Sequence, residues 1–266
     1  MRAPRPESPQ FSWCGESYVT IRLFSEVDIW SVAAVLRLQQ QLAESDVART
    51  IIAMVPGWTT LLLWLDADVV DPSAVERTIV SAVSARAERE IEFESRVLTL
   101  PTVYGGEGGP DLEFVADVNG LSVDDTVERL QATQFAGMVS FSPGMANCMW
   151  IDSSDALTAP KYDSPRTTTP PGTVGLGGSS ISLYSVATPG GFQMVGQLAV
   201  PIYQPRPTLP AFQDSPTLLR PGDRIVLRAV GLDDLTAIRK KVACGSYRYA
   251  IEPGSCRVAD GELTWT

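Results

Sequence analysis

The order of periodic segments in the N-terminal third of the sequence limits the fold more than any other feature. Residues 18–24 alternate between apolar and polar side chains as a strand does, and apolar residues then recur at helical spacing after Asp28, a suitable N-cap. Two apolar segments flank a Pro-Gly turn, a second helix follows an Asp-Pro pair, and "IEFESRVLTL" predicts another strand. This order of strand, helix, strand, strand, helix and strand is that of a ferredoxin-like domain, which we expect over residues 18–98.

The remainder of the chain has a different composition. Beyond residue 135, Gly, Pro, Ser and Thr separate short apolar runs such as "SLYSV" and "DRIVLRAV", which predicts many short strands in a barrel or a sandwich. We therefore expect an α+β protein. Its predicted parts are a flexible N-terminal lead at 1–17, the ferredoxin-like domain at 18–98, a β-rich domain at 99–231 and a C-terminal extension at 232–266.

The charge of the chain argues against one class of partner. The formal net charge is -10, and Lys240 and Lys241 are its only adjacent lysines. Nucleic-acid binding is not expected, because phosphate neutralisation needs clustered basic residues.

No apolar run approaches the roughly 18 residues of a membrane span, and the proline-rich N-terminus lacks the apolar core of a secretory signal. These features predict a cytoplasmic protein without a membrane partner.

The sequence contains no histidine. Ser-His-Asp and Cys-His catalysis and HExxH zinc chemistry are therefore excluded within this chain, and acid–base work falls to carboxylates, Tyr, Lys or a partner. The four cysteines form no CxxC pair, and no P-loop lysine is present. We expect no metal site and no cofactor bound by this chain itself.

The stretch "VYGGEGGPDLEFVA" at 103–116 is the strongest candidate for a functional turn, because four glycines and a proline surround Glu107 and Asp111 before a helical pattern. Carboxylates are favoured at a helix start, so a structural and a catalytic role of Asp111 both stay open. Arg166, in a loop rich in Pro and Thr, is either an anion clamp or a solvated loop residue. The segment "SFSPG" nearly matches a nucleophile elbow, but no histidine is available to activate Ser142.

Several motifs taken together resemble one family. They are "YGGEGGPDLEFVADVNGLSVDDTVERL", "SFSPGM", "SPRTTTPPGTVGLGGSSISLYSVATPGGFQMVGQ" and "LLRPGDRIVLRAV". The family contains allophanate hydrolase subunit 1, the B component of 5-oxoprolinase, the sporulation kinase inhibitor KipI and the matching half of the urea carboxylase carboxyltransferase domain. The resemblance implies a ferredoxin-like domain followed by a cyclophilin-like β-barrel.

The same resemblance implies a partner and a chemistry. The partner is a related second subunit, of the type of allophanate hydrolase subunit 2 or of the C component of 5-oxoprolinase, and the substrate is a small amide, urea or lactam bound near the interface of the two barrels. In 5-oxoprolinase the reaction depends on ATP, which would bind through partner subunits. KipI-like members instead inhibit a histidine kinase by docking.

Motif position supplies the candidate site residues. Four residues are the catalytic candidates: Glu107 and Asp111 for polar function, Tyr104 for hydrogen bonding, and Arg166 for binding an anion or a carbonyl oxygen. The substrate-binding candidates are Ser142, Met145, Asn147, Met149, Trp150, Ser180, Leu183 and Tyr184.

The chain departs from the family pattern in two segments. "SFSPGMANCMWID" stands where the family has "GFxPGFxYLGG", and "GGSSISLYS" stands where it has "GGxQTGIYP". Met145, Met149, Trp150 and Leu183 would make the cavity more apolar than one fitted to urea or oxoproline. Two alternatives to the hydrolase subunit therefore stay open. One is a cofactor-free cyclase or isomerase, as a monomer or homo-oligomer, with an apolar pocket; the other is a KipI-like regulatory binder.

Overall fold

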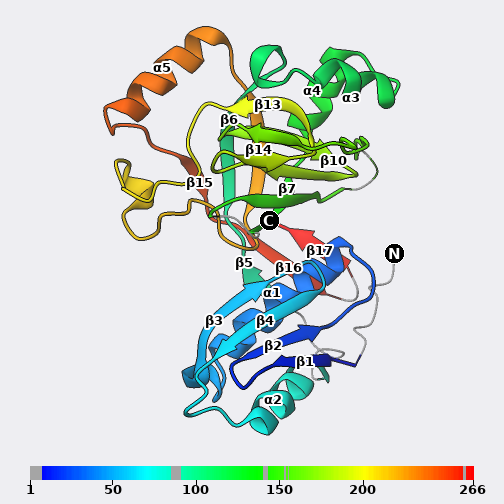
Figure 1. Ribbon diagram of the computed structural model, residues 1–266, viewed down its shortest axis with the longest axis vertical. Helices are drawn as coiled ribbons and strands as arrows, with labels where there is room; N and C mark the ends of the chain where they lie inside the picture. The colour runs from blue at the N-terminus through cyan, green and yellow to red at the C-terminus, as the bar shows by residue number, and fades with distance from the viewer. Residues whose placement is uncertain (1–7, 85–90, 140–142, 153, 155, 260–261) are drawn as a thin grey trace. The chain divides into compact units, whose positions relative to one another are not determined.

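The computed structural model describes residues 8–84, 91–139, 143–152, 154, 156–259 and 262–266. These residues form two compact units (Figure 1). The first contains the chain up to Ser95 together with Pro253–Thr266, and the second contains Arg96–Glu252. The segment predicted as a C-terminal extension is therefore shared between the units: α5 (Leu232–Ala243) and β15 (Ala250–Glu252) belong to the second, and the last residues return to the first.

In the first unit, two helices cover one face of an antiparallel sheet. The sheet order is β1 (Gln10–Cys14), β2 (Tyr18–Arg22), β4 (Thr60–Leu65) and β3 (Ile51–Pro56), and a short helix, η1 (Ala48–Thr50), precedes β3. The helices are α1 (Ile29–Ala43) and α2 (Pro72–Ser84). As predicted, Asp28 caps α1, and its carboxylate accepts a hydrogen bond from the Ser31 amide at 2.6 Å. Ile21 and Leu63 are fully buried against the helices, because alternate strand residues share one face.

One edge of this sheet differs from the prediction. The segment expected as the last strand of a ferredoxin-like sheet divides into β5 (Ile91–Glu94) and β6 (Val97–Tyr104). β5 pairs with β16 (Ser255–Ala259), which also pairs with β17 (Glu262–Trp265), so these strands form a separate sheet. The edge beside β2 is instead occupied by β1, which lies within the predicted flexible lead.

The side chains of β1 explain why it joins the sheet. Phe11 and Trp13 alternate with polar residues and pack against the core, and the Trp13 indole N–H donates to Glu76 Oε1 of α2 at 2.8 Å. Gly15, with a φ of 62°, allows the tight turn that returns the chain into β2. The prolines nearer the N-terminus suggested a loop, whereas the strand begins after them.

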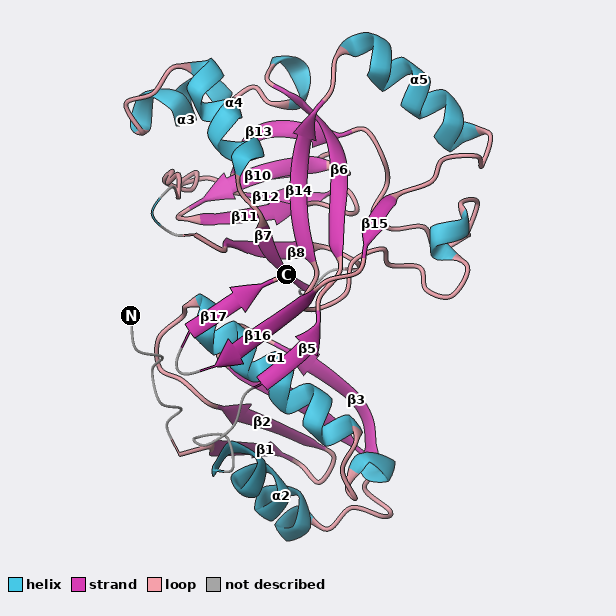
Figure 2. Ribbon diagram, turned by 180° about the vertical axis from the view of Figure 1, so that it is seen from behind, coloured by secondary structure: helices cyan, strands magenta, loops and turns pink. Residues whose placement is uncertain are grey.

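The second unit is built on a closed barrel of seven strands, which confirms the predicted α+β class and selects the barrel over the sandwich (Figure 2). Pairing of β13 with β6 closes the barrel, and β14 lies parallel to β6. In spatial order after β6, the barrel strands are β13 (Gln193–Leu198), β10 (Thr173–Gly177), β11 (Ser180–Leu183), β8 (Ala146–Trp150), β7 (Phe135–Val139) and β14 (Arg224–Ala229). β15 pairs antiparallel with residues 97–99 at the start of β6, and β9 (Arg166–Thr169) pairs with β12 (Thr188–Gly190).

The barrel encloses a packed hydrophobic core. Phe135 and Trp150 meet edge to face with their ring centroids 4.9 Å apart, and Leu183 and Leu227 are fully buried in the same cluster. Small barrels of this kind are filled by side chains. The functional surfaces of the second unit are therefore expected outside the barrel.

Short helices lie outside the barrel of the second unit. After β6 come η3 (Gly106–Gly108), α3 (Leu112–Val118) and α4 (Val123–Ala132), while η5 (Pro210–Phe212) follows β13. Ser122 caps α4, and its hydroxyl oxygen accepts a hydrogen bond from the Asp125 amide at 3.0 Å. Within the part of the chain that the structure describes, no helix combines the length and the apolar character that a membrane span requires.

Candidate functional site

The glycine-rich turn after β6 runs tightly against the neighbouring strand β13. Gly105 and Gly106 adopt φ values of 69° and 58°, which glycine reaches without strain. The Gly105 amide donates to the Val195 carbonyl at 3.1 Å. At Gly109 a Cβ atom would lie 2.3 Å from the Val195 oxygen, so this position excludes any side chain. The glycines thus bring the turn onto the barrel wall and hold α3 beside it.

Asp111 connects this turn to the barrel. Its backbone amide donates to the Met194 carbonyl at 3.0 Å, and its Oδ2 atom accepts the Met194 amide at 2.6 Å. The same Oδ2 lies 2.5 Å from Arg166 Nη2, and Oδ1 accepts the Tyr162 hydroxyl at 2.7 Å. Asp111 is only 8% exposed, so this carboxylate is a largely desolvated anion with three donors.

Arg166 is held from several sides. Its Nη1 donates to the Phe192 carbonyl at 3.1 Å, its Nη2 also donates to the Tyr162 hydroxyl at 2.8 Å, and its guanidinium lies 4.2 Å from the centroid of the Tyr162 ring. The structure thus brings together two predicted catalytic residues, Asp111 and Arg166, from opposite ends of a long segment. The ion pair fixes the guanidinium, whose side chain remains 24% exposed and can present its other N–H groups to a ligand.

Tyr162 is a member of this cluster that the sequence analysis missed. The available signal was weak: an aromatic hydroxyl four residues before Arg166 in a loop of Pro, Ser and Thr. Its hydrogen bond to Asp111 is the largest effect on the phenol and raises the pKa of Tyr162, so the hydroxyl stays protonated as a donor.

Tyr184, a predicted substrate-binding residue, lies close to the same cluster. It is buried, and burial raises the pKa of Tyr184 while the nearby charge of Arg166 opposes that rise. A Cβ atom at Gly190 would lie 2.5 Å from the Tyr184 hydroxyl oxygen, so any side chain there would have to displace the Tyr184 ring. We refer to Asp111, Tyr162, Arg166 and Tyr184 as the ion-pair cluster.

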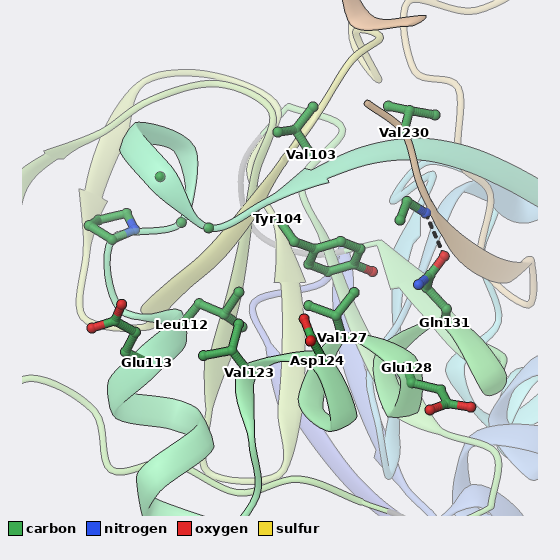
Figure 3. A pocket seen from close by; sticks show the side chains of 15 residues that line it. Val103, Tyr104, Leu112, Glu113, Val123, Asp124, Val127, Glu128, Gln131 and Val230 are labelled. Carbon is green, nitrogen blue, oxygen red and sulfur yellow. Dashed lines mark hydrogen bonds between the residues drawn. The ribbon is translucent and has the colours of Figure 1, made fainter. Parts of the chain in front are cut away.

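A pocket of about 660 Å³ lies against the glycine-rich turn, which contributes to its wall (Figure 3). The ring of Tyr104 lines it, and the Tyr104 hydroxyl donates to the Leu227 carbonyl at 3.2 Å. Burial raises the pKa of Tyr104, so this phenol is a neutral hydrogen-bonding group and not a proton acceptor near neutral pH. The other lining side chains come mainly from α3, α4 and the end of β14.

Glu107, the remaining predicted catalytic residue, lies apart from these contacts. It is exposed in η3 and does not line the pocket. Among the described residues it forms no hydrogen bond or ion pair with the ion-pair cluster. The turn therefore carries Tyr104 into the pocket and Asp111 into the cluster, and places Glu107 toward solvent.

Strand alternation divides the predicted substrate-binding residues between two faces of the barrel wall. Trp150 and Leu183 belong to the core inside the barrel, and the buried Trp150 indole N–H has no hydrogen-bond partner among the described residues. Asn147, Met149 and Ser180 lie on the other face, half-buried, where Met149 pairs with Ser180 across β8 and β11. The Asn147 side-chain oxygen accepts the hydroxyl of Ser182, a residue the sequence analysis did not select, at 2.8 Å.

Two predicted positions remain. Met145 is buried just before β8, on the opposite side of the strand from the core residue Ala146. Ser142 lies outside the described residues. The apolar side chains that were expected to line one cavity therefore do not share a single face.

Comparison with known proteins agrees with this architecture. Residues 9–213 match the family described as the carboxyltransferase domain, subdomain C and D. The B component of 5-oxoprolinase from Escherichia coli O157:H7 is 32% identical over 215 residues, which cover 79% of this chain and 91% of that protein. The corresponding B component from Bacillus subtilis is 28% identical over 87% of this chain and 97% of that protein.

Larger proteins contain a similar segment. Urea amidolyase of Saccharomyces cerevisiae is 30% identical over 144 residues, which are 53% of this chain and 8% of that protein. The crystal structure of Kluyveromyces lactis urea carboxylase shares the fold with a TM-score of 0.76 at 21% identity, over 93% of this chain and 24% of that one. This chain thus spans about a quarter of that larger protein. The family match and the long alignment with the B component of 5-oxoprolinase show that the chain belongs to the carboxyltransferase domain, subdomain C and D, family.

Proposed function

We propose that this chain is one subunit of an enzyme system that processes a small amide, urea or lactam together with a related second subunit. The observation that carries the proposal is the alignment with the B components of two 5-oxoprolinases, which extends over 91% and 97% of their lengths. The alignment therefore covers nearly the whole length of those two relatives. A hydrolase of the 5-oxoprolinase type is the activity this likeness favours.

Within such a system, Arg166 is the residue we propose to bind the substrate carbonyl. Opening an amide or lactam builds negative charge on the carbonyl oxygen, and a fixed cation stabilises that charge. Arg166 meets the requirement for fixation, because Asp111, Tyr162 and Phe192 each hold part of its guanidinium. Asp111 then acts as a positioning residue, since its carboxylate already accepts three hydrogen bonds.

In the proposed system, the partner subunits and not this chain bind the nucleotide. The sequence has neither a P-loop lysine nor a histidine, so ATP, where the reaction uses it, would be bound by the other subunits. This chain would contribute the barrel, the ion-pair cluster and a surface for the second subunit.

The test compares two arginines in similar ion pairs. The chain is co-expressed with the second subunit and with the partner subunit that binds ATP, and ATP-dependent ring opening of 5-oxoproline is measured for wild type, Arg166→Lys and Arg96→Lys. Arg96 Nη2 lies 2.5 Å from Asp223 Oδ2, and its side chain is 24% exposed, as in Arg166. We expect Arg166→Lys to lower kcat by about a hundredfold while Arg96→Lys affects mainly stability. Equal activities of the two variants, or no activity of the wild-type complex on amide, urea or lactam substrates, would contradict the proposal.

A further inference from the structure

The pocket beside the glycine-rich turn has an apolar floor. Val103, Leu112, Val123, Val127 and Val230 contribute aliphatic side chains, and the Tyr104 ring lies among them (Figure 3). We call this feature the turn groove. All of these residues belong to the second unit, so the groove is a property of that unit alone.

The uncharged polar side chains of the turn groove, Tyr104 and Gln131, are engaged by the protein itself. The Tyr104 hydroxyl donates to the Leu227 carbonyl, and Gln131 Oε1 accepts the Ala229 amide at 2.8 Å. A small polar substrate is normally held by several converging polar groups. In the turn groove the side chains left for a ligand are aliphatic groups and carboxylates, so the groove suits a cationic group beside an apolar one better than a neutral amide, urea or lactam.

The charged side chains of the groove all have one sign. Glu113, Asp124 and Glu128 line it, whereas none of the described lining residues is a lysine or an arginine. These carboxylates repel an anionic ligand and attract a cation. An apolar centre with charged residues around it is the usual anatomy of a protein–protein interface.

From these features we infer that the turn groove is the docking site for a segment of the second subunit that carries Lys or Arg beside an apolar side chain. The apolar side chain fills the floor, and the basic residue pairs with Asp124 and Glu128. The inference deepens the proposed function and rests on it, because its occupant is the partner subunit. It also makes the partner-binding surface distinct from the ion-pair cluster, none of whose four residues lines the groove.

The experiment measures the affinity of the purified full-length chain for the purified second subunit, the C component of 5-oxoprolinase or its counterpart, by titration calorimetry. One variant combines Asp124→Lys with Glu128→Lys, and another, Ala229→Trp, fills the groove from its exposed edge. The control combines Asp233→Lys with Asp234→Lys in the first turn of α5. It makes the same charge change, and it also replaces carboxylates at a helix start. Circular dichroism verifies that each variant is folded.

We expect each groove variant to weaken binding by about tenfold or more, and the α5 control to stay close to wild type. The affinity of the wild type should also fall as added salt shortens the Debye length from about 10 Å to about 3 Å. The variant that combines Asp124→Lys with Glu128→Lys should lose that dependence of affinity on salt. If the second subunit binds wild type and groove variants equally, the docking inference is overturned and the proposed function stands. If it does not bind the wild type at all, both fail.

Discussion

Asp111 Oδ2 and Arg166 Nη2 lie 2.5 Å apart although their residues are 55 positions apart in the sequence. This ion pair fastens the first residue of β9 to the turn that begins α3. The cluster around it therefore fixes two segments of the second unit that local structure alone does not connect. Its energy and its geometry are both open to measurement.

A double-mutant cycle tests the pair directly. We expect Asp111→Ala and Arg166→Ala each to lower the free energy of unfolding by about 1–3 kcal/mol, because each leaves a charged partner without its counterion. The coupling energy should be about 1–2 kcal/mol in urea unfolding experiments. The Arg96–Asp223 pair serves as a reference cycle, since it has the same distance. A coupling energy near zero for Asp111 and Arg166, with a coupling energy of about 1–2 kcal/mol for Arg96 and Asp223, would contradict this account.

The stability of the protein should depend on Tyr162 at alkaline pH. The hydrogen bond to Asp111 raises the pKa of Tyr162 above its ordinary value of 10.0, so the folded state binds this proton more tightly than the unfolded chain. That contribution is complete below pH 10.0 and is lost as the pH rises through the raised pKa. We therefore expect Tyr162→Phe to lose stability less steeply than wild type above pH 10.0, measured by urea unfolding at a series of pH values. If the free energies of unfolding of wild type and Tyr162→Phe fall in parallel as the pH rises, the Tyr162 hydroxyl does not contribute in this way.

Two glycines of the turn should differ sharply in their tolerance of alanine. At Gly109 a Cβ atom would lie 2.3 Å from the Val195 oxygen, whereas at Gly106 nothing lies within 4 Å and the obstacle is the positive φ alone. Gly106→Ala should lower stability by about 1–2 kcal/mol, and Gly109→Ala by about 3 kcal/mol or by loss of folding. Thermal unfolding of both variants provides the measurement. A Gly109→Ala protein as stable as the Gly106→Ala protein would be incompatible with the described turn.

Alanine substitutions at two neighbouring residues of β8 should differ in their effect on stability, because one residue lies in the barrel core and the other on the outer face. Trp150 is 4% exposed inside the barrel, and Met149 is half-buried on the opposite face. Trp150→Ala should lower the free energy of unfolding by about 3–5 kcal/mol, and Met149→Ala by about 1 kcal/mol. Similar losses for the two variants would mean that Trp150 does not belong to the core.

Local signals in the sequence were sufficient where the structure depends on local chemistry. Asp28 and Ser122 begin helices because each side chain accepts an amide three residues ahead, and that relation is visible in the sequence. The glycine-rich turn was also identifiable, since consecutive glycines before a Pro-Asp pair indicate a special backbone. The barrel followed from short strands together with the family resemblance.

The remaining features depend on choices between distant segments. β1 and the segment from Ile91 both have strand character, and nothing local decides which one pairs with β2. Trp150 and Met149 are both large and apolar, and only the position of the barrel axis determines which one faces the core. Tyr162 joins Asp111 across 51 residues, so no periodic pattern could reveal the contact.

Co-purification provides the most direct test of the central claim, that this chain acts as one part of a larger enzyme. The chain is co-expressed with the second subunit, of the type of the C component of 5-oxoprolinase. A tag on that second subunit alone is used for purification, and light scattering measures the mass of the complex. The account predicts a stable complex containing both chains and ring-opening activity that neither chain has alone. A homogeneous monomer or homodimer of this chain that is active without any partner would contradict it.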